Sequence, residues 1–274
     1  MAESITLVGK LAGAFTAMLS IMLPVIGADV GDGPELAAHF ASQVDRRLEV
    51  PELEQRRYAE LLAETFANHR QALPTSQYVV MVDRSPHVQA LMLYWISGNA
   101  AVHFIGASPV STGKPGQFEY FETPAGVFDH TVGNLDFRAE GTRNKFGVCG
   151  YGQKGMRVYD FGWVGAPRGW GDGHEGTMRL QMHATDPALL EPSLGIVRSK
   201  GCIRIPAALN TFFDRYGILD ADYERAMVAG KKFFVMLATR EPTPWSGRYL
   251  VVVDTRRAER PEWSPLPDAV RLKD

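Results

Sequence analysis

Three short runs rich in branched and aromatic side chains constrain the fold more than any other feature of the chain. They are QYVVMVDR, HVQALMLYWI and AVHFIGASPV, which begin at Gln77, His87 and Ala101. Ser-Pro and Gly-Asn dipeptides separate them, and such dipeptides mark turns. Short apolar runs between turns predict strands, so we expect a mainly β domain. Further strands are expected at 156–164, 177–183, 231–239 and 248–254.

Before these strands the chain shows helical spacing. A helix is expected over residues 34–48, and a second one begins at Pro51, because proline is favoured in the first helical turn. In the second helix Tyr58, Leu62 and Phe66 recur at the spacing of one helical face. We expect both helices to pack against the β domain.

Helical spacing returns in the segment 206–230. Leu209 and Phe213 lie on one face of the first helix expected there. Gly217 suits its C-terminal cap, because glycine adopts the left-handed conformation that often ends a helix. Asp220 is expected to cap a second, short helix with its side chain.

The first 28 residues have the pattern of a secretory signal peptide. The stretch 11–28 carries no charge, follows Lys10 and ends in small residues. An uncleaved membrane anchor or a buried helix would also fit an uncharged run of this length. Pro24, which breaks a helix just before the small residues, favours cleavage. Cleaved or anchored, the remaining chain is expected to be exported to the periplasm or cell envelope.

A chain of 274 residues needs no more than one large domain with extensions. We divide it into a signal peptide at 1–28, a helical extension at 29–76, a main domain at 77–240 and a C-terminal strand with an irregular tail at 241–274. The net charge is −2 and no basic tract is present, so nucleic acid is not an expected partner. Two cysteines are too few for a disulfide framework.

One of the two cysteines, Cys202, lies in the polar phrase RSKGCIRIP. Lys200 and Arg204 flank it, and nearby positive charge favours the thiolate form of a cysteine. We therefore expect Cys202 to be a nucleophile. The turn at Gly201 is expected to offer a backbone N–H to a developing oxyanion.

A cysteine nucleophile needs a base within hydrogen-bond reach, together with a group that orients the base. His183 is the best placed of the seven histidines, because it ends a strand-like run. A loop punctuated by prolines then leads to Ser199 and can return the cysteine turn towards it.

The arrangement of His183 followed by SKGCIR at 199–204 resembles the active-site signature of the L,D-transpeptidase (YkuD-type) family. A second block, PVSTGK at 109–114 followed by TPAGVF at 123–128, resembles another motif of that family. The resemblance covers about residues 77–240. It implies a β-sandwich-like catalytic domain with a few short inserted helices.

The resemblance also implies roles for individual residues. Cys202 would be the nucleophile and His183 its general base. The main-chain carbonyl of Ala184 would orient the imidazole. The family's activity is acyl transfer on the stem peptides of bacterial peptidoglycan, and it requires no metal or organic cofactor.

Four further residues are expected to bind substrate. Ser199 and Arg204 match the family motif, and the guanidinium fork of Arg204 suits a substrate carboxylate or backbone carbonyls. Lys200 replaces the usual histidine, so we expect it to hold the thiolate or pair with a substrate carboxylate. The alternative is an exposed turn lysine. Tyr120 belongs to a segment expected to cover the substrate, although a solvent-facing strand aromatic fits equally.

The implied reaction cleaves the bond between the third stem residue, diaminopimelate in a Gram-negative host, and a terminal D-Ala. The resulting thioester passes to an amine of a second stem. Two alternatives remain open: a carboxypeptidase or amidase that uses water on the same scaffold, and a non-catalytic wall-binding module.

Two other groups of residues could suggest different chemistry. Asp172 and His174 together with His183 could suggest a metal site, but they lack a recognised ligand spacing, so no metal is expected. Cys149 is expected to be a small buried residue that does not pair with Cys202.

Overall fold

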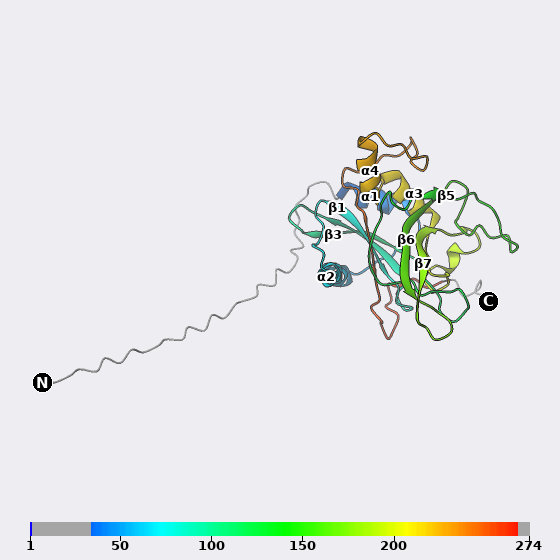
Figure 1. Cartoon of the computed structure of the whole chain (residues 1–274), viewed down its shortest axis with the longest axis horizontal. Coiled ribbons are helices and arrows are strands. Elements are labelled where there is room, and N and C mark those ends of the chain that lie inside the picture. The colour runs from blue at the N-terminus through cyan, green and yellow to red at the C-terminus, as the bar shows by residue number, and fades with distance from the viewer. Residues whose placement is uncertain (2–33, 268–274) are drawn as a thin grey trace.

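Two β-sheets form the centre of a mixed α/β fold (Figure 1). The computed structural model describes Met1 and residues 34–267. The expected signal peptide at 1–28 therefore lies outside the described residues except for Met1, as do residues 29–33 and 268–274.

The first sheet has the strand order β3-β2-β1-β9-β4. The three runs that predicted strands form an antiparallel meander of β1, β2 and β3, so that prediction is confirmed. The strand expected at 248–254 is β9, which pairs in parallel with β1 and antiparallel with β4. The C-terminal strand is thus an inner strand of this sheet. The bounds are β1 Gln77–Asp83, β2 Ala90–Ile96, β3 Val102–Pro109, β4 Gly126–Asp129 and β9 Tyr249–Val253.

The second sheet has the order β5-β6-β7-β8. The strands expected at 156–164 and 177–183 are confirmed as β6 and β7, and both extend further than predicted. Strand β8 is short and runs parallel to β7. The bounds are β5 Phe137–Arg138, β6 Arg157–Pro167, β7 Glu175–Ala184 and β8 Ile203–Ile205.

The prediction of a strand at 231–239 is wrong. These residues form turns, one of them closed by a hydrogen bond from Met236 N–H to the Phe233 carbonyl. The carbonyl of Val235 accepts a hydrogen bond from Arg138 Nε at 2.9 Å. Phe234 is fully exposed. The apolar composition was therefore misleading, because this segment meets no sheet edge.

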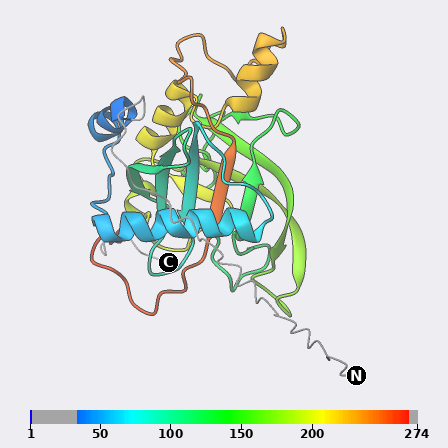
Figure 2. The ribbon, with the colours of Figure 1, turned by 90° about the vertical axis from the view of Figure 1, so that its left-hand side faces the viewer.

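The first sheet is buried on both faces, which explains its almost uninterrupted apolar sequence. Tyr78, Val80 and Val82 belong to a core shared with residues of the second sheet. Val79 and Met81, which alternate with them, belong to a second core that includes helix α2. Figure 2 shows α2 lying across the strands of this sheet.

The two expected N-terminal helices are α1, Pro34–Gln43, and α2, Glu52–Asn68. Helix α1 ends five residues before the expected residue 48. The chain leaves the helix there and reaches the sheet, where Leu48 N–H donates to the carbonyl of Ala107 on β3. No helix of the described chain is both long and apolar enough to cross a membrane.

The two expected C-terminal helices are α3, Ala207–Tyr216, and α4, Ala221–Val228. Gly217 caps α3 in the left-handed conformation, as predicted, with φ of 61°. Asp220 precedes α4, but its side chain makes no capping hydrogen bond, so that part of the prediction is wrong. Instead it forms ion pairs with Arg157 and Arg240. A short 3₁₀ turn spans Glu191–Ser193.

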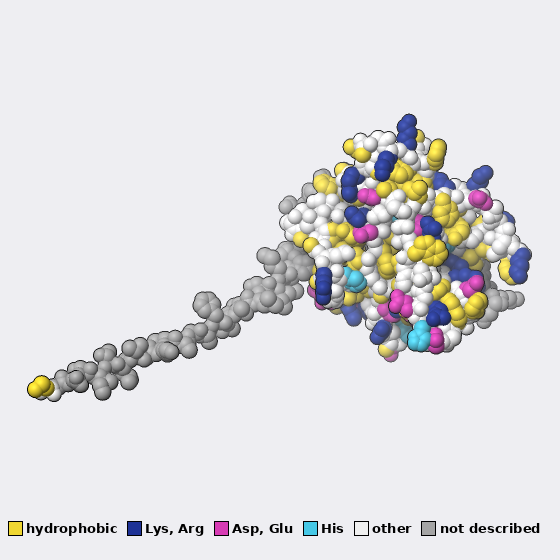
Figure 3. Space-filling view, viewed as in Figure 1, with side chains coloured by type: hydrophobic (Ala, Val, Ile, Leu, Met, Phe, Trp, Pro, Cys, Tyr) yellow, Lys and Arg dark blue, Asp and Glu magenta, His cyan; other side chains and the backbone are white. Residues whose placement is uncertain are grey.

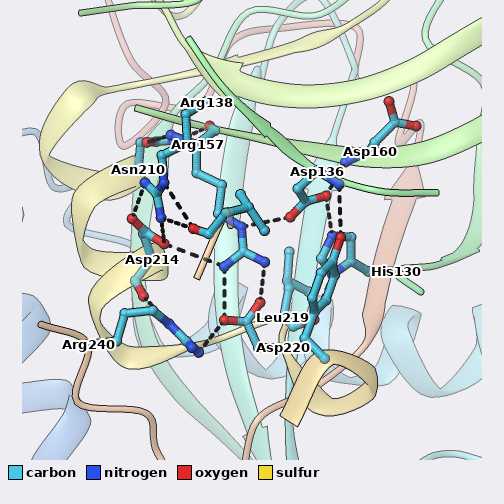
Figure 4. A network of polar contacts seen from close by, with 12 residues as sticks. His130, Asp136, Arg138, Arg157, Asp160, Asn210, Asp214, Leu219, Asp220 and Arg240 are labelled. Carbon is cyan, nitrogen blue, oxygen red and sulfur yellow. Dashed lines mark hydrogen bonds and ion pairs between the residues drawn. The ribbon is translucent and has the colours of Figure 1, made fainter. Parts of the chain in front are cut away.

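A buried network of charges joins the second sheet to α3 and α4 (Figure 4). The side chain of Arg157, on β6, is completely buried and forms ion pairs with Asp136, Asp214 and Asp220. Carboxylates from three directions offset the cost of removing this guanidinium from water. The network thereby fixes one end of β6 beneath the helices.

Candidate active site

Strands β7 and β8 bring Cys202 close to His183. In their parallel register Met182 lies beside Ile203, and His183 lies beside Arg204. Met182 and Ile203 are fully buried in the shared core. Because side chains alternate along a strand, His183 and Arg204 project from the opposite face. Cys202 precedes Arg204 by two residues, which places it on the same side as the imidazole.

The His183 imidazole is buried, and its orientation is fixed by a backbone carbonyl. Nδ1 lies 2.7 Å from the carbonyl oxygen of Ala184, which is the contact implied by the family resemblance. A carbonyl can only accept, so Nδ1 carries the proton and Nε2 keeps its lone pair. Burial and the positive charge of Arg204 together lower the pKa of His183 to about 4, although the hydrogen bond to the Ala184 carbonyl opposes them. The imidazole is therefore neutral at pH 7 and can accept a proton.

The thiol of Cys202 is partly buried and lies 3.9 Å from the carbonyl oxygen of Arg179. Burial raises the pKa of this thiol. A hydrogen bond from the backbone of Gln181 and the charge of Arg204 lower the pKa, but they do not overcome the burial. The expectation that flanking cations hold a resting thiolate is therefore wrong. The site combines a neutral thiol with a neutral imidazole.

Ser199 shapes the cysteine turn. Its hydroxyl is buried, donates to the carbonyl of Cys202 at 2.5 Å and accepts from the N–H of Gly201 at 3.0 Å. The expected substrate-binding role of Ser199 is therefore not what the structure shows. The N–H of Gly201 is likewise already paired, so it is not free to bind an oxyanion, contrary to expectation.

The turn requires glycine at position 201. Gly201 has φ of +127°, a conformation that residues with a side chain rarely adopt. An added Cβ atom would also lie 2.8 Å from the side chain of Met178. A residue with a side chain would therefore strain the turn next to Cys202.

The upstream motif at 109–114 packs directly on the cysteine turn. Ser111 and Arg204 exchange two backbone hydrogen bonds of 3.0 and 2.9 Å. The N–H of Lys114 donates to the carbonyl of Ser199 at 2.9 Å. Strand β8 is thereby held between β7 and the chain that follows β3.

Thr123, the first residue of the motif at 123–128, connects three parts of the site. Its buried hydroxyl donates to the carbonyl of Gly201 at 2.6 Å and accepts from the N–H of Gly113 at 2.9 Å. An added Cβ atom on Gly113 would lie only 2.0 Å from the carbonyl oxygen of Phe121. Both upstream motifs therefore support the cysteine turn.

The side chain of Lys200 extends towards Glu119 and Tyr120. Its side chain is 59% exposed, and Nζ lies 3.6 Å from a carboxylate oxygen of Glu119 and 5.4 Å from the ring centroid of Tyr120. No effect of Lys200 on the pKa of Cys202 is found. The alternative of an exposed turn lysine fits the structure better than a role in holding the thiolate. Tyr120 is partly buried and lies beside it at the edge of a cavity.

That cavity has a volume of about 500 Å³ and adjoins the site at Arg204. Its walls come from the loop after β3, the segment 144–150 and the segment 190–198. Tyr120, Lys114, Arg198 and Arg204 supply its main polar side chains. Arg204, which lines this cavity, projects from the same face of the sheet as His183.

A row of polar side chains beside the imidazole was not predicted from the sequence. The ring of Tyr151 packs edge-on against His183, with the centroids 4.6 Å apart, and its hydroxyl lies 3.2 Å from Gln181 Oε1. Gln181 and Arg179 both donate to the buried carboxylate of Asp160. The alternation of Arg179, Gln181 and His183 along one strand could have indicated two of these residues. No sequence signal pointed to Tyr151 or Asp160.

The suggested metal ligands do not converge. His174 and Asp172 are exposed and lie 3.4 Å apart, whereas His183 is turned towards Ala184. Among the described residues there is no group of three or more His, Cys, Asp or Glu side chains that could hold a metal ion.

Both cysteines are free thiols. Cys149 is buried, as expected, and its Sγ lies 3.5 Å from the carbonyl oxygen of Gly141. The thiol of Cys202 is therefore not held in a disulfide.

No model of a known protein family matches this chain, and a comparison with curated proteins finds no similar sequence. The geometry of the site and the motifs at 109–128 and 183–204 are therefore the guides to its function.

Proposed function

We propose that this protein is an L,D-transpeptidase that acts on peptidoglycan stem peptides through an acyl intermediate on Cys202. The observation that carries the proposal is the pairing of β7 with β8, which places Cys202 on the same face as a neutral imidazole. The hydrogen bond from His183 Nδ1 to the Ala184 carbonyl leaves Nε2 free to act as a base. A wall-binding module would need neither group.

The arrangement of the sheets supports the same proposal. One core is shared by the two sheets, while the opposite face of the second sheet carries His183 and Arg204. This agrees with the β-sandwich-like catalytic domain that the motifs imply. In this proposal α1 and α2 are additions to that domain, and the protein is exported to the cell envelope, where peptidoglycan is found.

The acylation step requires one proton to move twice. His183 Nε2 accepts the proton of the Cys202 thiol as the sulfur attacks the carbonyl carbon between diaminopimelate and D-Ala. The imidazolium then gives this proton to the nitrogen of D-Ala as the carbon–nitrogen bond breaks. D-Ala leaves as a free amino acid, and the third stem residue remains as a thioester on Cys202.

The second step restores the thiol. An amine from another stem gives a proton to His183 Nε2 while its nitrogen attacks the thioester carbonyl. The carbon–sulfur bond breaks, and the imidazolium returns a proton to the Cys202 sulfur. The product is a crosslink between the third residues of two stems. If water attacked the thioester in place of the amine, the product would be a tripeptide and the enzyme would be a carboxypeptidase.

Incubation of the purified protein with disaccharide tetrapeptide, followed by mass analysis of the products, tests the proposal. A crosslinked dimer with release of D-Ala is expected. Tripeptide monomer alone would reassign the protein as a hydrolase, and the absence of any product would favour a binding module. The Cys149→Ala variant should give the wild-type products, whereas Cys202→Ala should give none.

A further inference from the structure

Arg204 is a mostly buried arginine whose guanidinium group forms no hydrogen bond or ion pair with the residues that the structure describes. In the described part of the chain, no carboxylate forms an ion pair or hydrogen bond with its guanidinium group. Burial lowers its pKa, and the neighbouring positive charge of Arg198 lowers it further. Arg157, which is also buried, is instead surrounded by three carboxylates. A buried cation without a counter-ion is costly, so such a group usually serves a ligand.

Two further cations share the cavity of about 500 Å³ with Arg204. They are Arg198 and Lys114, and neither forms an ion pair or side-chain hydrogen bond within the described residues. None of the acidic residues in the described chain lines this cavity. On the face shown in Figure 3, by contrast, acidic and basic side chains are interspersed. The cavity is therefore a local concentration of unbalanced positive charge beside Cys202.

The three cations come from different parts of the chain and differ in their relation to the reacting thiol. Arg204 lies beside His183 in the strand register, and its charge acts on both His183 and Cys202. Arg198 precedes the cysteine turn and Lys114 follows β3, so both line the cavity from segments outside the β7–β8 pair. A ligand that satisfies all three would carry one anionic group near the reacting bond and another further away.

We propose that this cavity is a subsite for two carboxylates of the donor peptide. Arg204 binds the carboxylate of the leaving D-Ala, two bonds from the nitrogen that departs. Arg198 and Lys114 bind the free side-chain carboxylate of diaminopimelate. The assignment of these carboxylates rests on the proposed function. Lys200 is not part of the subsite, because it faces Glu119 and does not line the cavity.

The subsite predicts discrimination between two forms of one peptide. The Cys202→Ala protein binds without reacting, so its affinity for the tetrapeptide can be measured by calorimetry. A second tetrapeptide, identical but amidated at the diaminopimelate side-chain carboxylate, serves as the matched ligand. We expect amidation to weaken binding by about 10-fold or more, because it removes a charge-assisted hydrogen bond.

Arg198→Met in the Cys202→Ala background should bind the free and amidated peptides equally. Lys114→Gln, which changes an exposed side chain, should reduce the discrimination in the same direction. Arg256→Met is the matched control, because Arg256 is exposed and does not line the cavity. Discrimination that is absent in the parent protein, or unchanged in both cavity variants, would overturn the subsite.

Different results would overturn the carboxylate subsite and the transpeptidase function. Acylation of the wild-type protein by both peptides at equal rates and with equal KM would remove the subsite and leave the transpeptidase. Absence of acylation would remove the transpeptidase. In that case free meso-diaminopimelate is the ligand for calorimetry with the wild-type protein. Binding that is lost in Arg198→Met would support the anion subsite, and absence of binding would overturn it.

Discussion

Nδ1 of His183 lies 2.7 Å from the carbonyl oxygen of Ala184, the next residue along β7. This single contact sets the tautomer of a buried imidazole and leaves Nε2 as its basic nitrogen. The histidine is held by its own strand, so its orientation depends on a backbone atom that any residue at position 184 would supply. The adjacent β8 then places the thiol on the same face.

His183→Ala should slow acylation of the protein by a peptide donor by about 10²- to 10⁴-fold, the usual contribution of a positioned general base. Intact-mass measurements over time give this rate. His174→Ala, which removes an exposed histidine, is the control and should react like the wild type. An unchanged rate in His183→Ala would assign the base to another residue.

The acylation rate should also depend on pH in a specific way. Since burial lowers the pKa of His183 to about 4, the imidazole stays neutral and basic well below its ordinary pKa of about 6.5. The contribution of this residue should hold from pH 7 to about pH 5 and decline as the pH approaches 4. A decline centred near pH 6.5 would show that the imidazole is not desolvated.

Arg204 and Lys200 should differ in their influence on Cys202. The charge of Arg204 lowers the pKa of the thiol, whereas the charge of Lys200 is paired with Glu119. Arg204→Gln should therefore shift the alkylation of Cys202 by iodoacetamide towards higher pH, and Lys200→Gln should leave it unchanged. The measurement is the alkylation rate against pH in a Cys149→Ala background. A shift in Lys200→Gln would restore the electrostatic role expected from the sequence.

Thr123→Val should loosen the cysteine turn without removing any group expected to react. The variant keeps the shape of the side chain but leaves the carbonyl of Gly201 and the N–H of Gly113 without their partner. Buried groups left unpaired cost about 1–3 kcal/mol each. We expect a lower free energy of unfolding in urea and slower acylation. Thr211→Val, at an exposed position on α3, should change neither.

The buried His130 should make stability depend on pH. Its Nδ1 lies 2.7 Å from the Leu219 carbonyl and its Nε2 2.8 Å from Asp136, so both nitrogens donate and the ring is an imidazolium (Figure 4). Burial alone would lower the pKa of His130, but Asp136 outweighs it and the pKa is raised.

A raised folded-state pKa stabilises the protein fully below the unfolded value of about 6.5. This stabilisation is lost as the pH rises through the folded-state pKa. Urea unfolding at increasing pH should show the loss, and His130→Phe should lack it. A parallel decline in both proteins would assign the effect to other groups.

The parts of the fold that were predicted from the sequence depend on local patterns. Runs such as 78–83 are bounded by turns and are buried throughout, and Gly217 adopts the left-handed conformation that caps α3. The segment 231–239 has a similar apolar content, but whether it pairs depends on a distant partner. In the structure it pairs with no strand, and the side chain of Arg138 donates a hydrogen bond to its Val235 carbonyl.

The same distinction applies to the site. Cys202, His183 and Ala184 were predicted because a short motif specifies them, and the structure brings them together. The functions of Ser199 and the Gly201 N–H were mispredicted, because they depend on which groups pair within a folded turn. Tyr151 reaches His183 from the segment between β5 and β6, and no local sequence pattern encodes that contact.

Brief exposure of the protein to disaccharide tetrapeptide, followed by measurement of its mass, tests whether Cys202 carries an acyl intermediate. The mass should rise by that of the disaccharide tripeptide acyl group, and proteolysis should locate the adduct on the peptide containing Cys202. The Cys202→Ala protein should show no adduct. Free D-Ala should appear in equal amount. An adduct on Cys149, or products released by the Cys202→Ala protein, would contradict the proposed function.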